Sequence, residues 1–174
     1  MTYAVTRQIA IDAGHRIATH GSKCRHLHGH RYTIEVTCQG VALHGSGEQT
    51  DMVLDFGFLK QELMANIDEP CDHGVIVAVS DEEVLAMFAP PEPAFADWLA
   101  ALRRTVAAEG FAIPAGCRLG QKLYVMAFQP TAECLARHWF DRLAPAVERR
   151  SDGLARLERV TVWETPNCRA DYGR

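Results

Sequence analysis

The part of the chain best suited to chemistry is the run CRHLHGH at positions 24–30, together with a histidine upstream at His15. His28 and His30 are two residues apart, so in a strand their side chains point to the same face. His15 can supply a third imidazole from a neighbouring strand. Three neutral imidazoles leave one position of a tetrahedral zinc ion open, which a catalytic site needs and a structural site avoids. The spacing therefore favours a catalytic metal site.

Cys24 lies four residues before His28 and adds a thiol beside the expected metal. A lone cysteine more often packs in the interior than reacts. Here the loop is rich in histidine and arginine, which favours the thiolate, the reactive form. We therefore expect Cys24 to act as a nucleophile or base. The alternative is a closed structural site of Cys24, His28 and His30 in a zinc-binding module that is not an enzyme.

Three further acidic positions have both a structural and a chemical interpretation. Asp72 precedes His73 in a loop, which is either a solvated turn or a dyad in which the carboxylate orients the imidazole for proton transfer. Glu164 ends the apolar face of a strand, where a carboxylate is costly unless it is paired. Its partner is either an arginine or the N–H edge of a ligand such as a guanine or pterin ring. Glu133, in the first turn of a helix, either favours the helix dipole or binds a ligand.

The elements that position these residues follow from hydrophobic periodicity. Alternating apolar residues predict strands over about 3–13, 30–38 and 157–164, and an apolar run predicts another over 123–128. Apolar residues at helical spacing predict a helix capped by Asp55, a second helix over about 94–109, and a third that starts at Pro130-Thr131.

Composition excludes several classes of protein. The chain has 174 residues and a formal net charge of −4, enough for one domain with a core and short for two. The acidic balance argues against a nucleic-acid partner, which requires a basic face. The six cysteines lack the paired spacing of a disulfide framework. No apolar run is long enough for a membrane helix and no signal peptide is recognisable, so we expect a cytoplasmic protein without a membrane partner.

Six motifs, in order over nearly the whole chain, resemble the 6-pyruvoyl-tetrahydropterin synthase family, which includes the 6-carboxytetrahydropterin synthases. One such motif would be weak evidence, whereas six in the family's order are specific. They are AGHR at 13–16, Cys24 with HGHRY at 28–32, VLDF at 53–56 with LK at 59–60, Asp72-His73, PTAE at 130–133 and VWET at 162–165.

The resemblance implies an α+β architecture called the tunnelling fold. In this fold a four-stranded antiparallel sheet carries helices on one face, and the sheets of several subunits join into an oligomeric barrel. Two trimers stack into a homohexamer, and the active sites lie between subunits. The resemblance also implies a role for nine residues. The zinc ligands are His15, His28 and His30; the catalytic residues are Cys24, Asp72 and His73; the pterin-binding residues are Glu164 and, from the adjacent subunit, Thr131 and Glu133.

The resemblance further implies a pterin triphosphate substrate, 7,8-dihydroneopterin triphosphate. One family activity yields a pyruvoyl product. Another yields 6-carboxy-5,6,7,8-tetrahydropterin with release of acetaldehyde and triphosphate, for queuosine synthesis. Three residues separate Cys24 from His28, as in the bacterial carboxy enzymes, whereas the animal pyruvoyl enzymes have a longer gap. The carboxy activity, a zinc-dependent lyase, is therefore favoured; the pyruvoyl synthase or another pterin side-chain lyase is the alternative.

One segment, at about 80–122, matches nothing in the compact members of the family. We expect a single domain over 1–174 with an insertion at this point, carrying the helix around Trp98. Such an insertion could cap the active site, extend a subunit interface or decorate an edge.

Overall fold

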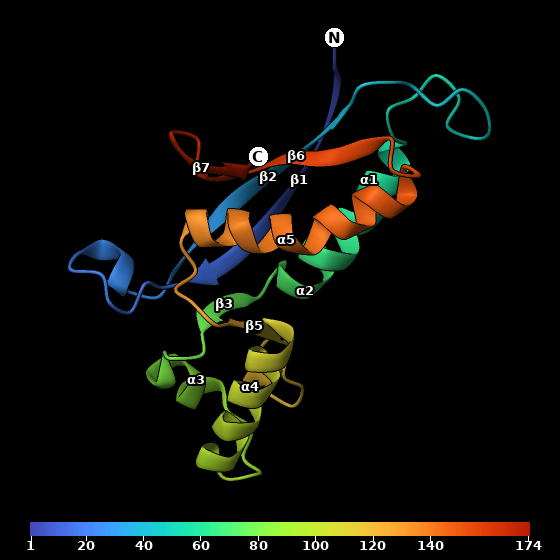
Figure 1. Ribbon diagram of the computed structural model, residues 1–174. Helices are drawn as coiled ribbons and strands as arrows, with labels where there is room; N and C mark the ends of the chain where they lie inside the picture. Colours follow the sequence, from blue (N-terminus) through green and yellow to red (C-terminus); the bar gives the residue numbers. More distant parts are fainter. The chain divides into compact units, whose positions relative to one another are not determined.

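The computed structural model describes residues 1–174, and its strands form one mixed sheet (Figure 1). Hydrogen-bonded neighbours follow the order β4-β5-β3-β1-β2-β6-β7. The pairs β2–β6, β6–β7 and β4–β5 are antiparallel, whereas β3 is parallel to both β1 and β5. The strands are β1 (Tyr3–His15), β2 (His28–Gly40), β3 (Val75–Ala78), β4 (Phe111–Ala112), β5 (Leu123–Met126), β6 (Ala155–Thr165) and β7 (Cys168–Gly173).

The helices confirm the positions that periodicity predicts. Asp55 caps the first of them, because its Oδ1 accepts a hydrogen bond from the backbone N of Gly57 at 2.5 Å. No helix is both long enough and apolar enough to span a bilayer. The helices are α1 (Phe56–Leu63), α2 (Glu69–Cys71), α3 (Glu82–Phe88), α4 (Phe95–Glu109) and α5 (Ala132–Arg150), with a π-helical turn at Met64–Asp68 and 3-10 turns at Lys23–Arg25 and Arg118–Gly120.

The α+β class is confirmed, but the expected four-stranded antiparallel sheet is wrong, because the sheet has seven strands and is mixed. All four residues of β3 are buried, so this strand lacks the alternation that marks a half-exposed strand. β7 is almost entirely exposed and polar, as edge strands often are, and so carries little periodic signal. The subunit barrel stays a prediction.

The chain divides into two compact units, each with its own core. The first comprises residues 1–10, 31–69 and 132–174. Its core includes the inward face of β2, where Tyr32, Ile34, Val36 and Cys38 are fully buried on the one face that alternation predicts. Helix α5 packs against β6 and β7. Each large apolar side chain buried in this way contributes about 1.5–3 kcal/mol to folding.

The second unit comprises residues 11–30 and 70–131 and contains the segment at 80–122. Helices α3 and α4, green and olive in Figure 1, share one apolar core with β3 and β5. Helix α4 ends at Gly110, whose φ of +82° is the left-handed conformation that glycine adopts without a steric cost. The buried residues of this core are Val75, Val77, Val84, Leu85, Ala89, Trp98, Leu99, Leu102, Val106, Ala112, Cys117, Leu123 and Val125.

A buried histidine in α5 makes the stability of the fold depend on pH. Burial lowers the pKa of His138 from 6.5 to about 4, and the charges of Arg142 and Arg137 act in the same direction. His138 is therefore protonated below about pH 6.5 in the unfolded chain, but only below about pH 4 in the folded chain. Stability falls as the pH decreases through this window. At about 1.4 kcal/mol per pKa unit, the contribution is about 3 kcal/mol.

We therefore expect His138→Gln to flatten the dependence of the unfolding free energy on pH between about 7 and 4. Urea unfolding, monitored by circular dichroism in the presence of a chelator, measures this slope. His20→Gln is the matched control, because His20 is exposed. Equal slopes for His138→Gln and the parent would mean that His138 does not resist protonation.

Candidate metal centre

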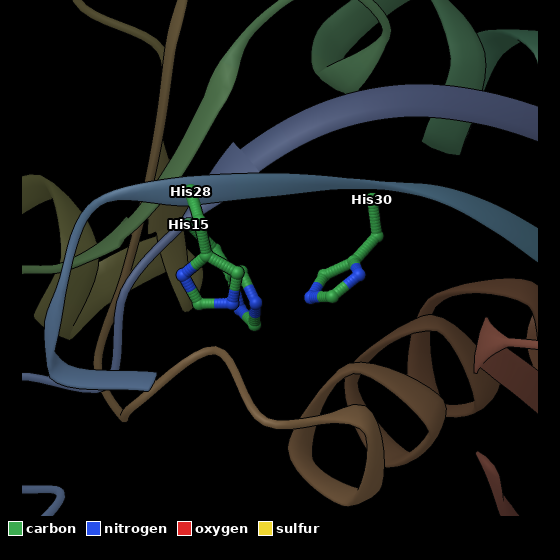
Figure 2. Close-up of side chains that lie close together, drawn as sticks. All are labelled: His15, His28 and His30. Atoms are coloured by element: carbon green, nitrogen blue, oxygen red, sulfur yellow. The ribbon is translucent and has the colours of Figure 1, made fainter. Parts of the chain in front are cut away.

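Three histidines from two neighbouring strands converge on one point, as Figure 2 shows. His15 is the last residue of β1, and His28 and His30 open β2. One ligand nitrogen from each ring lies within 4.8 Å of the other two. The ring centroids are 4.6 Å apart for His15–His28, 5.1 Å for His15–His30 and 4.9 Å for His28–His30. This cluster is the group that the spacing of the sequence predicts, and it could hold a metal ion.

The hydrogen bonds of two rings fix the tautomer that a metal requires. Nδ1 of His15 lies 2.9 Å from the carbonyl oxygen of Pro130, and Nδ1 of His28 lies 2.7 Å from that of His26. A carbonyl oxygen only accepts, so each Nδ1 carries the proton and donates it. The Nε2 lone pair of each ring is then available for coordination. Orientation of a ligand histidine by a backbone carbonyl is the usual arrangement around protein-bound metals.

The electrostatics of the cluster also suit a cation. His15 is 1% exposed, and burial lowers its pKa to about 4, with the neighbouring His28 and His30 acting in the same direction. The imidazole of His15 is therefore neutral near neutral pH, which is the form that binds a metal. A set of three imidazole nitrogen donors fits a catalytic zinc ion or a similar divalent metal and leaves one coordination position open.

The glycine between the two histidines of β2 allows the strands to approach closely. A Cβ atom at Gly29 would lie 3.1 Å from the carbonyl oxygen of Ala13 in β1. On the other side of β1, the backbone N of Gly14 donates a hydrogen bond to the carbonyl oxygen of Gly74 at 2.8 Å. This bond connects the end of β1 to the loop before β3. The small size of Gly29 thus permits the close approach, and the hydrogen bond of Gly14 holds the strand end that carries His15.

Asp72 and His73 form the pair that the sequence predicts. His73 Nδ1 lies 2.7 Å from Asp72 Oδ2, while Asp72 Oδ1 accepts from the backbone N of Asp12 at 2.8 Å. The hydrogen bond from Asp12 lowers the pKa of Asp72, as do His73 and the positive charge of Lys122. The ionised carboxylate thus orients the exposed imidazole of His73, whose φ of +56° is uncommon for a residue with a side chain. This geometry suits proton transfer.

The remaining candidate residues occupy three other places. Cys24 is partly buried in the turn Lys23–Arg25 and lies outside the three-histidine cluster. Thr131 immediately precedes α5, and Glu133 is exposed in its first turn. Glu164 lies near the end of β6 and is partly buried. Their functional roles remain predictions.

The sequence interpretation missed Lys122, which precedes β5 and contacts the dyad. Its Nζ donates to the carbonyl oxygen of Asp72 at 2.7 Å, across 50 positions of sequence. The sequence signal that could have identified Lys122 is its position directly before the buried apolar run of β5. A lysine there lies at the end of the strand, not inside it.

This α+β fold with a three-histidine cluster defines a candidate metalloprotein, and comparisons with known proteins specify its family. The model of the family "6-pyruvoyl tetrahydropterin synthase" matches residues 4–174. The chain therefore belongs to the 6-pyruvoyl tetrahydropterin synthase family, which confirms the resemblance of its motifs.

Its relatives include 6-carboxy-5,6,7,8-tetrahydropterin synthases. The protein of that name from Rickettsia bellii is 32% identical over 94% of both chains. The one from Haemophilus influenzae is 27% identical over 98% of both. Among solved structures, an uncharacterized protein from Wolinella succinogenes matches with a TM-score of 0.68 at 21% identity, covering 100% of this chain and 99% of that one. The 6-pyruvoyl tetrahydropterin synthase from Plasmodium vivax matches with a TM-score of 0.60 at 16% identity, covering 100% and 98%. These structures support the fold alone.

Proposed function

We propose that this protein is a zinc-dependent lyase that converts 7,8-dihydroneopterin triphosphate and one water molecule to 6-carboxy-5,6,7,8-tetrahydropterin, acetaldehyde and triphosphate. The observation that carries the proposal is the 32% identity, over 94% of both chains, to a protein named for that product. The three residues between Cys24 and His28 support the carboxy product over the pyruvoyl product. The product would enter queuosine synthesis.

His15, His28 and His30 would hold the zinc ion. When bound, the ion supplies Lewis acidity to hydroxyl groups of the substrate side chain and so acidifies the neighbouring C–H bond. The carbonyls of Pro130 and His26 keep the rings of His15 and His28 in the coordinating tautomer.

The remaining residues move protons and bind the ring. The thiolate of Cys24 removes the acidified proton, and His73, oriented by Asp72, returns a proton as the triphosphate leaves. Glu164, partly buried near the end of β6, accepts hydrogen bonds from the N–H edge of the pterin. Thr131 and Glu133 line the pocket from the adjacent subunit of a homohexamer built as a dimer of trimers.

Product analysis tests this proposal. The zinc-loaded protein is incubated with 7,8-dihydroneopterin triphosphate, and the products are identified by mass spectrometry. A carboxypterin together with acetaldehyde supports the proposal. A pyruvoyl product would contradict the proposed reaction but leave the assigned site residues in place. Absence of turnover with zinc bound would exclude this substrate.

Chelation separates a catalytic metal from a structural one. We expect removal of zinc by a chelator to abolish turnover while the circular dichroism spectrum keeps its folded shape, because the three histidines lie at strand ends beside an extensive apolar core. Unfolding upon chelation would instead indicate the non-enzymatic zinc module, whose fold depends on the metal.

A further inference from the structure

The segment that follows His15 is held by an ion pair to α3, within the second compact unit. Arg16 Nε lies 2.6 Å from Oδ2 of Asp81, and its Nη2 lies 2.8 Å from Oε2 of Glu83. The Asp81 side chain is only 2% exposed, whereas that of Glu83 is 82% exposed. The pair with Asp81 is therefore shielded from water, where an ion pair constrains geometry strongly, and the pair with Glu83 is a surface contact.

Asp81 is itself anchored in a rigid element. It is the N-cap of α3, where its Oδ1 accepts from the backbone N of Val84 at 3.4 Å and its backbone N donates to Ala78 at the end of β3. Val84 and Leu85 of this helix are buried in the core shared with α4. The carboxylate that Arg16 contacts thus has a fixed position.

Arg16 lies between the two parts of the proposed active site. His15, which precedes it, is a member of the histidine cluster. Ile17, which follows it, donates from its backbone N to the carbonyl oxygen of Cys24 at 2.8 Å. Ala18 continues the segment and donates to Oε1 of Gln129 at 3.0 Å. Fixing Arg16 therefore restrains His15 on one side and the Cys24 turn on the other.

We propose that the Arg16–Asp81 ion pair positions His15 and Cys24, so that the 80–122 segment supports the metal centre instead of decorating an edge. Neither side chain touches the metal or the substrate; both are positioning residues. The inference rests on the proposed metal site and assigns a role to this segment.

The test uses Asp81→Asn, which retains a good helix cap and removes the charge. Cobalt(II) serves as the probe, because its visible absorption reports the geometry of its ligands independently of turnover. We expect cobalt affinity and kcat each to fall about tenfold, the effect of losing a group that orients a ligand, with KM changed less than about twofold. Glu82→Gln is the matched control, since Glu82 is the residue after Asp81, in α3, and makes an exposed pair with Arg103 of α4.

Two variants of Arg16 distinguish a positioning role from a simple loss of folding. Arg16→Met should reproduce the losses of cobalt affinity and kcat, and Arg16→Lys, which keeps the charge without the guanidinium fork, should recover part of the affinity. Lower thermal stability with the parental cobalt spectrum, affinity and kcat would overturn the inference, because it would make the pair merely structural. If the parent protein itself binds no cobalt, the proposed metal site fails, and this inference fails with it.

Discussion

His28→Ala is expected to empty the metal centre. His28 supplies one of three nitrogens that lie within 4.8 Å of one another, and no further histidine, cysteine or carboxylate belongs to that cluster. With two ligands left, the site has no protein donor to replace the missing imidazole. Loss of a group that merely orients a ligand costs about 10–100-fold in metal affinity, so loss of the ligand itself should cost more than about 100-fold. Turnover should fall with the metal content.

The measurement is the zinc content of the purified variant by atomic absorption, with a competition titration for affinity. His26→Ala is the matched control. The His26 side chain is exposed two positions earlier, and the substitution keeps the backbone carbonyl that accepts from His28 Nδ1. The control should bind zinc like the parent. Full occupancy in His28→Ala would remove His28 from the ligand set and with it the proposed geometry.

The histidine cluster could be predicted from the sequence because its geometry is local. Period-two spacing places His28 and His30 on one face of β2, and the alternation of β1 extends to His15. The Asp72–His73 pair is also local, since its members are adjacent. The same holds for Asp55, whose capping side chain reaches only two residues along the chain.

The parts that could not be predicted depend on distant pairings. Arg16 and Asp81 are 65 positions apart, and Lys122 and Asp72 are 50 apart. No periodicity links such residues, because their proximity follows from the parallel pairing of β3 with β1 and β5. The short run that forms β3 is apolar throughout, so it shows neither a strand nor a helix period. Periodicity therefore underestimates the number of strands in the sheet, because a strand such as β3 shows no alternation of apolar and polar residues.

Cys24→Ala is expected to abolish turnover and leave the metal in place. Cys24 lies outside the histidine cluster, so its removal takes no ligand from the metal. The turn that carries it is held by backbone hydrogen bonds, from Ile17 N to Cys24 O and from His26 N to Lys23 O, which alanine preserves. Removal of a positioned base typically costs about 10²–10⁴-fold in rate. We therefore expect kcat to fall within this range, with the parental zinc content.

Steady-state kinetics on the zinc-loaded variant, with product identification by mass spectrometry, provide the measurement. Cys168→Ala is the matched control, because Cys168 is an exposed cysteine at the start of β7 and should retain the parental rate. A parental rate in Cys24→Ala would exclude Cys24 as the base and leave the dyad of Asp72 and His73 as the group that takes the proton. Loss of zinc together with activity would instead place the thiolate among the metal ligands, as the closed structural site requires. The joint readout of rate and metal content thus distinguishes a catalytic base from a ligand at this position.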